Sequence, residues 1–361
     1  MTLLLRTNDG KESSSNDVFM DAVHLLNKGN IIAIKGVGGF HLACYARNEQ
    51  VVEELRKRKK RKDKPFALMA KDIDAIKLLV YKDIIVATFG DMMRVKGTET
   101  SLERSGSKDR KPIIVYSPFD VIEIAKNNRD KMVVFLAVGF ETTASAIASL
   151  VKHAEEKSIN NINVMTSIRL MPPILEKVLQ QHNGRLHGII CPGHVATIMG
   201  EEYFEFLPEK YRIASVISGF DAPDILGAIY LLVQSKCGSN EPELKNIYRK
   251  CVSINGNEKA KNLMEEVFKV DDGLWRGIGS VPDSALVLKE QYAKYDAVKN
   301  FNLSSWSEET SNACSCSDIL MGKKEPKDCN LFGTICNPVN PYGPCMVSSE
   351  GACSIYYEYR R

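Results

Sequence analysis

The chain has 361 residues, 44% of them hydrophobic, and its 48 Lys and Arg residues nearly balance 45 Asp and Glu residues, for a net charge of +3. This composition is ordinary for a globular protein with real cores, and it excludes the strongly basic surface that general nucleic-acid binding requires. No apolar run reaches the length of a membrane span, and the start, MTLLLRTNDG, lacks the apolar core of a signal peptide. We therefore expect a cytoplasmic protein without membrane or nucleic-acid partners. In a reducing cytoplasm, clustered cysteines are more often metal ligands or redox groups than structural disulfides.

The first part of the chain predicts two helices around a strand and a glycine turn. An apolar periodicity opens at Asn16 and ends at Gly29, and a second helical pattern covers residues 48–62. Between them, IIAIKGVGGF (31–40) predicts a strand that runs into a turn whose backbone N–H groups suit an anion. The basic run RKRKKRKDK (56–64) is either a solvated face or a phosphate-binding surface. Nucleic-acid binding is a third alternative, but no interleaved aromatic residues support it.

From residue 83 the chain alternates short apolar runs with helical segments. The runs, each closed by Gly, Pro or Ser, are IIVATFG, PIIVYS, MVVFLAVGF, INVMTS, LHGIICPG and YRIASVISGF. Buried parallel strands have this pattern, and with helices such as PPILEKVLQQH it predicts an α/β fold with more than one Rossmann-like parallel sheet. Residues 138–151 and 218–233 share the order strand, Gly-Phe, acid, helix. This echo predicts two related α/β halves facing one cleft.

Six of the ten cysteines lie between residues 314 and 353, after a linker rich in Ser, Glu and Asn at 302–312. Their spacing, C-x-C-x12-C-x6-C-x8-C-x7-C, is neither a regular ferredoxin run nor a paired zinc ribbon. Zinc needs four ligands, whereas an iron–sulfur cluster with a nearby dithiol would use all six cysteines. The density of thiols favours metal binding over a tail of scattered cysteines, and the spacing alone leaves the choice of metal open.

Three further residues follow predicted strands, where open α/β sheets place their ligand sites. His194, in CPGHV, suits iron ligation or proton transfer, although a single histidine more often only hydrogen-bonds a turn; Cys191 in the same turn favours a soft-ligand or redox role. Glu141 and Asp221 each follow a Gly-Phe pair. They either point toward the same region as His194 or serve as helix N-caps.

Residues 83–361 closely resemble the HypD family, which helps to build the Fe(CN)2CO centre of nickel–iron hydrogenases. The matching stretches are VATFGDMMRVKGT, IVYSPFDVIEIAKNNRDK, VVFLAVGFETTA, IICPGHV, WRGIGSVPDSAL, DCNLFG and GPCMVSSEGACSIYY. Residues 17 to about 77 instead resemble part of the YrdC-type domain of HypF, the carbamoyl-transferring protein of the same pathway, through IIAIKGVGGFHLACYARNE and LRKRKKRKDKPFALMA. The resemblances divide the chain into a partial YrdC-like α/β segment (1–78), HypD-like α/β domains with Rossmann-like layers around a cleft (79–304) and a small cysteine-rich iron–sulfur domain (305–361).

The resemblance to HypD implies a role for each cysteine of the C-terminal segment and for three cleft residues. The ligands of a 4Fe-4S cluster would be Cys314, Cys329, Cys336 and Cys353, the redox dithiol would be Cys316 and Cys345, and the cleft residues near the iron would be His194, Glu141 and Glu350. It also implies HypC-type and HypE-type partners, and an assembly scaffold with redox chemistry rather than a turnover enzyme. The Cys-Gly-Thr-His and Gly-Pro-Gly-Cys-Pro-Val-Cys motifs of the family do not occur in the chain. The first holds the cysteine thought to bind iron, so we expect weakened or absent iron binding at the cleft.

The resemblance to HypF implies an alternative function. The pocket for ATP and carbamoyl-adenylate would include Lys35, Arg58, Lys59, Arg61 and Lys64. Tyr45 stands where that domain usually has an Asp, and most of the domain is absent. The competing hypotheses are therefore a protein that forms carbamoyl-adenylate from ATP and carbamoyl phosphate, and a non-functional chimera joined near residues 75–85.

Overall fold

The computed structural model describes residues 24–25, 28, 32–36, 39–43, 50, 84–95, 101–103, 111–182, 186–238, 241–276, 278–303, 314–348 and 351–359. The chain divides into two units, Met1–Lys64 and Pro65–Arg361. In the first unit, β1 (Ile32–Gly36) pairs with β2 (Gly39–Ala43) as an antiparallel hairpin. The predicted strand coincides with β1, whereas most of the two predicted helices lies outside the described residues. The segment boundaries at 78 and 304 stay predictions.

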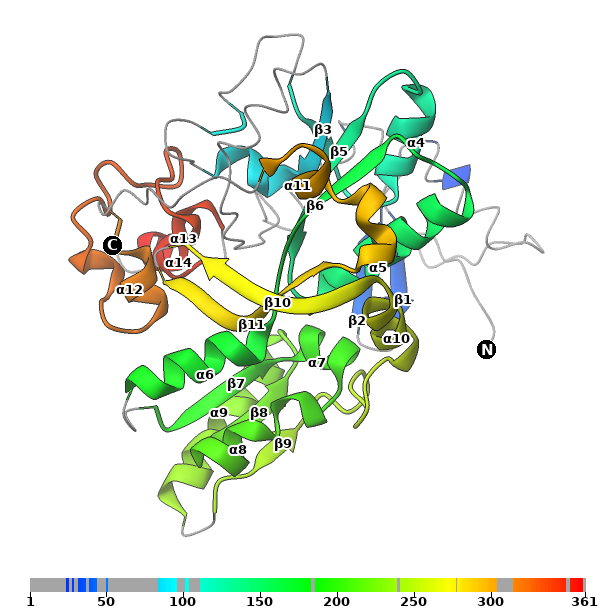
Figure 1. Cartoon of the computed structure of the whole chain (residues 1–361). Coiled ribbons are helices and arrows are strands. Elements are labelled where there is room, and N and C mark those ends of the chain that lie inside the picture. The colour runs from blue at the N-terminus through cyan, green and yellow to red at the C-terminus, as the bar shows by residue number, and fades with distance from the viewer. Residues whose placement is uncertain are drawn as a thin grey trace. The chain divides into compact units, whose positions relative to one another are not determined.

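The second unit contains a mixed six-stranded sheet in the order β10-β11-β6-β5-β3-β4 (Figure 1). Four parallel strands, which match predicted apolar runs, form its main part: β3 (Ile85–Phe89), β4 (Ile113–Val115), β5 (Val133–Gly139) and β6 (Ile162–Arg169). An antiparallel hairpin extends it: β10 (Phe268–Trp275) and β11 (Gly279–Leu288), with β11 antiparallel to β6. The sequence predicted parallel sheets only, so the mixed character of this sheet corrects that prediction.

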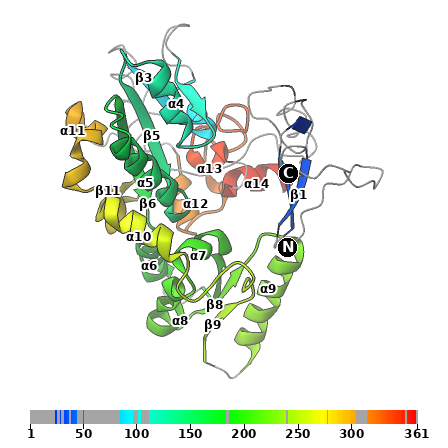
Figure 2. The same ribbon diagram turned by 90° about the vertical axis from the view of Figure 1, so that its right-hand side faces the viewer.

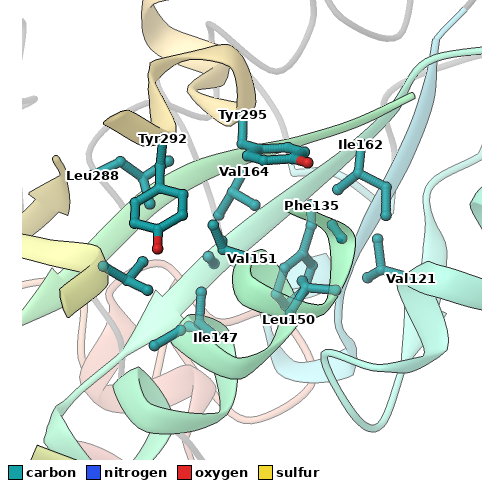
Figure 3. Packing of buried hydrophobic residues seen from close by; sticks show 14 of the residues in the cluster. Val121, Phe135, Ile147, Leu150, Val151, Ile162, Val164, Leu288, Tyr292 and Tyr295 are labelled. Atoms are coloured by element: carbon teal, nitrogen blue, oxygen red, sulfur yellow. The ribbon is translucent and has the colours of Figure 1, made fainter. Parts of the chain in front are cut away.

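Helices cover the six-stranded sheet and connect its strands. They are η1 (Gly90–Arg94), α4 (Asp120–Asn127), α5 (Glu141–Glu156), α10 (Glu258–Val267), η3 (Glu290–Tyr295) and α11 (Ala297–Asn300). The apolar residues of α5 recur at helical spacing, so one side of this helix faces the core. Figure 3 shows Ile147, Leu150 and Val151 of α5 beside Phe135 and Val164 of the sheet. β5 is buried at every position, as expected of a central strand.

A second hydrophobic cluster holds the C-terminal segment against the same sheet. It combines Val134 and Leu136 of β5 with Met92 of η1, and it includes Val347 near the C-terminus. The guanidinium of Arg94 also donates to the carbonyl oxygen of Val347, at 3.5 Å. The cysteine-rich segment therefore packs against η1 and the six-stranded sheet.

The second unit also contains a parallel three-stranded sheet in the order β7-β8-β9. Its strands are β7 (Gly188–Pro192), β8 (Ala214–Ser218) and β9 (Leu244–Asn246), and its helices are α6 (Met171–His182), α7 (Gly193–Met199), η2 (Glu202–Phe204), α8 (Phe206–Tyr211) and α9 (Ala222–Cys237). Figure 2 shows the long α9 beside this sheet. The two echoing sequence units are β5–α5 in the large sheet and β8–α9 in the small one.

The described residues of the cysteine-rich segment form short helices joined by turns. They are α12 (Cys316–Leu320), η5 (Pro326–Asp328), α13 (Pro344–Val347) and α14 (Ala352–Tyr359). Among all the described helices, none has the length and apolar character to cross a membrane.

Candidate functional site

Sulfur forms much of the interior of the cysteine-rich segment. Five of its cysteines are buried in one cluster, and Cys314 packs against that cluster half-buried: the buried ones are Cys316, Cys329, Cys336, Cys345 and Cys353. Ile319 and Met346 complete the cluster, and the aromatic rings of Phe332 and Tyr357 pack at its margin. The structure therefore brings together all six cysteines that the sequence singled out.

Two of the six cysteines are joined to each other. Cys316, at the start of α12, forms a disulfide with Cys345 of α13, and their Cα atoms lie 6.3 Å apart. These are the two residues for which the resemblance implied a redox dithiol. Their redox role stays a prediction.

The four other thiols lie close enough to influence one another electrostatically. The pKa of Cys353 is raised to about 12, chiefly by burial and also by the neighbouring Cys336, Cys314 and Cys329. The pKa of Cys314 is raised to about 11, again chiefly by burial and also by Cys329 and Cys336. Negative charge at Cys329 and Cys336 therefore opposes the ionisation of both Cys314 and Cys353, which shows that the four sulfurs lie close to one another.

Backbone N–H groups point at two of these sulfurs. Burial acts to raise the pKa of Cys329, but hydrogen bonds from the backbone of Ser315, Leu331 and Phe332, with one from the Ser315 side chain, outweigh it and lower the pKa. The N–H of Tyr342 donates to Sγ of Cys336 at 3.3 Å. N–H donors of this kind stabilise thiolate charge in metal–sulfur centres.

Two glycines allow the backbone to approach the cysteines closely. A Cβ at Gly343 would lie 2.7 Å from Sγ of Cys314, and a Cβ at Gly351 would overlap the backbone of Cys345. A side chain at position 351 would therefore clash with backbone, and one at position 343 would displace the sulfur of Cys314. The sequence contains them in GPCMVSSEGAC, but nothing in the pattern says which sulfur each glycine faces.

The donor chemistry of the cluster fits an iron–sulfur centre: four thiols outside the disulfide, largely shielded from water and supplied with N–H donors. Within the described part of the chain, however, no three His, Cys, Asp or Glu side chains are arranged so that they could hold a metal ion. The segment thus has the ligand set of a metal centre without its coordination geometry.

Arg276 is a neighbour of the cluster that the sequence reasoning missed. It lies in the turn between β10 and β11, and its positive charge acts to lower the pKa of Cys314. The hairpin was not predicted, so nothing placed its turn beside residue 314. The sequence signal that could have identified Arg276 was the stretch WRGIGSVPDSAL, which contains it. This stretch resembles the HypD family but has no feature of a metal site.

Glu141 is fully buried at the start of α5. Its Oε1 accepts hydrogen bonds from the backbone N–H of Met171 at 2.7 Å and from the hydroxyl of Tyr203 at 2.6 Å. Among the described residues, its Oε2 has no hydrogen-bond partner. Burial raises the pKa of the carboxyl despite these two bonds, and the phenol pKa of Tyr203 is raised as well, by burial and by Glu141. The placement of Glu141 in a cleft stays a prediction.

His194 lies at the carboxyl end of β7, where α7 begins, and its side chain is exposed. Its ring contacts that of Phe220, with 4.6 Å between the ring centroids. Asp221, the next residue, is the N-cap position of α9 but accepts no capping hydrogen bond through its side chain. Cys191 is buried in β7, and burial raises its pKa to about 12, so it is a thiol at neutral pH. In the described part of the chain no hydrogen bond or ring contact joins His194 to Glu141.

The structure does not describe the side chains of the remaining predicted site residues. Glu350, Arg58, Lys59, Arg61 and Lys64 lie outside the described residues. Lys35 is described only as a backbone position of β1. The predicted ATP pocket therefore stays a prediction.

Comparison with known proteins identifies the larger part of the chain. The model of HypD, described as the hydrogenase formation hypA family, matches residues 67–360. The chain belongs to the HypD family. A second family model, Sua5/YciO/YrdC, described as telomere recombination, matches residues 24–97. The HypD match covers most of the chain and the other a minor part, as the resemblances predicted.

Individual HypD relatives agree with the family match. The hydrogenase maturation factor HypD2 of Bradyrhizobium diazoefficiens is 40% identical over 295 residues, which are 80% of this chain and 77% of the relative. A putative hydrogenase expression/formation protein of Methanocaldococcus jannaschii is 39% identical over 291 residues, 81% of each chain. The hydrogenase maturation factor HypD of Escherichia coli is 33% identical over 287 residues, 79% of this chain and 77% of the relative.

Proposed function

We propose that the chain is a HypD-type hydrogenase maturation factor, a cysteine-rich scaffold on which iron, as the substrate, receives its CN and CO ligands. One observation carries the proposal: in a member of the HypD family, four free cysteines pack in one cluster beside a disulfide between the two other cysteines of the same segment. A zinc site would not explain the Cys316–Cys345 pair, because zinc has no redox chemistry and does not exchange electrons with a disulfide.

Cys314, Cys329, Cys336 and Cys353 would hold a resident 4Fe-4S cluster, which would supply electrons one at a time when bound. The chain's own contribution is the environment. The N–H groups directed at Cys329 and Cys336 stabilise the thiolate form, and Phe332 and Ile319 limit the access of water. The positive charge of Arg276 favours a thiolate at Cys314.

The disulfide between Cys316 and Cys345 is a second redox group, and it accepts two electrons. Reduction breaks the sulfur–sulfur bond of Cys316 and Cys345, takes up two electrons and two protons and leaves two thiols. Both residues belong to the same buried cluster as the four proposed ligands. The pair is therefore suited to exchange electrons with a cluster bound there.

His194 is the described residue best suited to contact the substrate iron. It is exposed at the carboxyl end of a parallel strand, and its ring contact with Phe220 restricts its orientation. Glu141 would favour its protonated form more than an exposed carboxyl does, because burial raises its pKa. We infer HypC-type and HypE-type partners from the resemblance, and weak iron binding because the two cysteine motifs of the family are absent.

Iron and sulfide analysis of anaerobically purified protein tests the proposed cluster. We expect iron, acid-labile sulfide and a brown colour in the wild type and their loss in Cys329→Ala. The matched control is Cys237→Ala, because Cys237 is free and exposed and lies outside the cysteine-rich segment. Unchanged iron content in Cys329→Ala, or zinc in place of iron in the wild type, would contradict the proposal.

The role of His194 is tested separately. Infrared spectra of the wild type, supplied with ferrous iron, cyanide and carbon monoxide in the presence of a HypC-type protein, are expected to carry weak CN and CO bands. His194→Ala is expected to lose these bands while it keeps the iron and sulfide of the cluster. Bands of unchanged intensity in the variant would remove His194 from the site.

A further inference from the structure

The three strands of the small sheet end at one edge, and the segments that follow them lie together there. β7, β8 and β9 are parallel and pair in that order, so their carboxyl ends are neighbours. His194 follows β7, Phe220 follows β8 and Tyr248 follows β9. Open parallel sheets place their ligand sites at this edge. A side chain that fixes these segments relative to one another therefore also fixes His194.

The ring of Tyr248 lies against the backbone of two glycines. A Cβ at Gly193 would lie 2.8 Å from its Cδ1 atom, and a Cβ at Gly219 would lie 3.0 Å from its Cε2 atom. These glycines directly precede His194 and Phe220, whose ring centroids are 4.6 Å apart. One aromatic ring therefore packs against both segments that carry the contact between His194 and Phe220.

Only glycine allows the chain to pack so closely at these two positions. A Cβ at Gly193 would overlap the carbonyl oxygen of Ser218, and a Cβ at Gly219 would overlap the carboxylate of Asp224. The segments after β7 and β8 are thus in direct backbone contact. The ring of Tyr248 occupies the space that side chains at both positions would need.

Tyr248 is held at its backbone and at its hydroxyl. Its N–H donates to Oδ1 of Asn246 at 2.9 Å, and the buried amide of Asn246 donates to Oε2 of Glu201 at 3.0 Å. Its hydroxyl is hydrogen-bonded to the thiol of Cys251, and this bond, together with burial, raises the pKa of Tyr248 to about 12. The phenol therefore stays protonated at neutral pH and keeps the bond.

We propose that Tyr248 is a positioning residue for His194: its ring holds the backbone of both segments and so fixes the orientation of the imidazole beside Phe220. Residues behind a metal ligand commonly fix the orientation of that ligand. The proposal rests on the proposed function, in which His194 contacts the substrate iron. Tyr248 acts through the backbone and does not touch the iron, so the orientation of His194 can be measured without iron delivery.

Nuclear magnetic resonance of the six histidine side chains in the full chain tests the positioning. The imidazole signal that is absent from His194→Ala belongs to His194, and the ring of Phe220 shifts it from its ordinary position, so Phe220→Leu should remove that shift. We expect Tyr248→Ala to lose most of the shift and Tyr248→Phe to keep it, because phenylalanine retains the ring. The matched control is Tyr230→Ala, which should keep the wild-type signal, because Tyr230 is 66% exposed on α9.

Circular dichroism verifies that each variant is folded. If Tyr248→Ala does not fold, Tyr248→Leu takes its place, because leucine keeps apolar volume but lacks the flat ring that fits both backbones. An unchanged His194 signal in the folded Ala or Leu variant would overturn the proposal, even if urea unfolding showed a loss of stability. A loss of the shift in Tyr248→Phe would overturn it as well, because the ring would then not be the positioning group.

The infrared bands of CN and CO connect the positioning to the iron. Under the conditions given for His194→Ala, Tyr248→Ala should lose these bands and Tyr248→Phe should keep them, with the iron and sulfide of the cluster unchanged in both. Bands that His194→Ala loses but Tyr248→Ala keeps would overturn the positioning role alone. A wild type without bands would instead overturn the proposed contact of His194 with iron, and the imidazole signals would still decide whether Tyr248 orients His194.

Discussion

The hydroxyl of Tyr203 donates a 2.6 Å hydrogen bond to Oε1 of Glu141, although the two residues are 62 positions apart. Glu141 begins α5, which follows the central strand of the six-stranded sheet, and Tyr203 lies in η2 beside the three-stranded sheet. The same oxygen accepts the N–H of Met171, the first residue of α6. One buried carboxyl therefore connects the two sheets of the second unit.

Replacing Glu141 by Gln should make stability less dependent on pH. Burial raises the folded-state pKa of Glu141 above its ordinary value of 4.5. Its contribution to stability is thus fully present below that value and is lost as the pH rises through the folded-state pKa. The wild type should lose stability relative to Glu141→Gln as the pH rises from 4.5 toward neutrality. Thermal melts across this range measure the difference, and a wild type that gains stability relative to the variant would refute the prediction.

Replacing Glu141 by Ala should destabilise the chain at every pH. The variant leaves the Tyr203 hydroxyl and the Met171 N–H without their acceptor in a buried site, and each unsatisfied group costs about 1–3 kcal/mol. Urea unfolding measures the loss. If Ala and Gln at this position prove equally stable, the hydrogen bonds to Oε1 contribute nothing.

Gly343→Ala should lower the iron content of the chain. The new methyl group would lie 2.7 Å from Sγ of Cys314, which must then move away from the other thiols. The matched control is Gly227→Ala in α9, where the nearest atom is 3.6 Å away, so a gain of about 0.5–1 kcal/mol from helix propensity is expected. Iron assay of both purified variants makes the comparison. Full iron loading of Gly343→Ala would place Cys314 outside the ligand set.

Cys316→Ser should abolish the disulfide without removing the iron. Cys345 would then react as an additional free thiol under denaturing conditions, and the iron and sulfide content should stay near that of the wild type. A thiol assay with and without prior reduction, together with metal analysis, measures both quantities. Loss of iron would show that the pair belongs to the ligand set rather than beside it.

Asn161→Ala should destabilise the large sheet. The amide of Asn161 donates to the carbonyl oxygens of Ala125, Asn128 and Lys131, at 3.0, 3.0 and 3.1 Å, and so fixes the chain between α4 and β5. Loss of these bonds to partly buried carbonyls should cost about 1–3 kcal/mol in urea unfolding. The adjacent Asn160 is exposed, and Asn160→Ala should change stability by less than about 0.5 kcal/mol.

The parallel strands were predictable because a buried strand in an α/β fold is apolar along its whole length. β5, with the sequence VVFLAVG, is the clearest case. The β10–β11 hairpin lacks that signal. Positions 269–272 of β10 are exposed, and β11 contains Pro282, which argues against a strand in a sequence-based analysis. Both strands lie toward the edge of the sheet, where such residues are tolerated.

The residues of the candidate site were predictable only where the amino-acid type alone indicates the chemistry, as it does for cysteine. Cysteines are rare and reactive, so their clustering stood out in the sequence. The bonds of Glu141 to Tyr203 and Met171, and the influence of Arg276 on Cys314, join residues far apart along the chain. Such pairs follow from the packing of the two sheets and of the hairpin turn, which a single sequence does not specify.

The interior of the C-terminal segment is made largely of sulfur where most small domains use hydrocarbon. Oxygen attacks thiolates and leaves leucine side chains alone, so the same oxidation that ends the chemistry of this segment also removes the material that keeps it folded. Aerobic handling should therefore loosen the last fifty residues first, while both sheets persist.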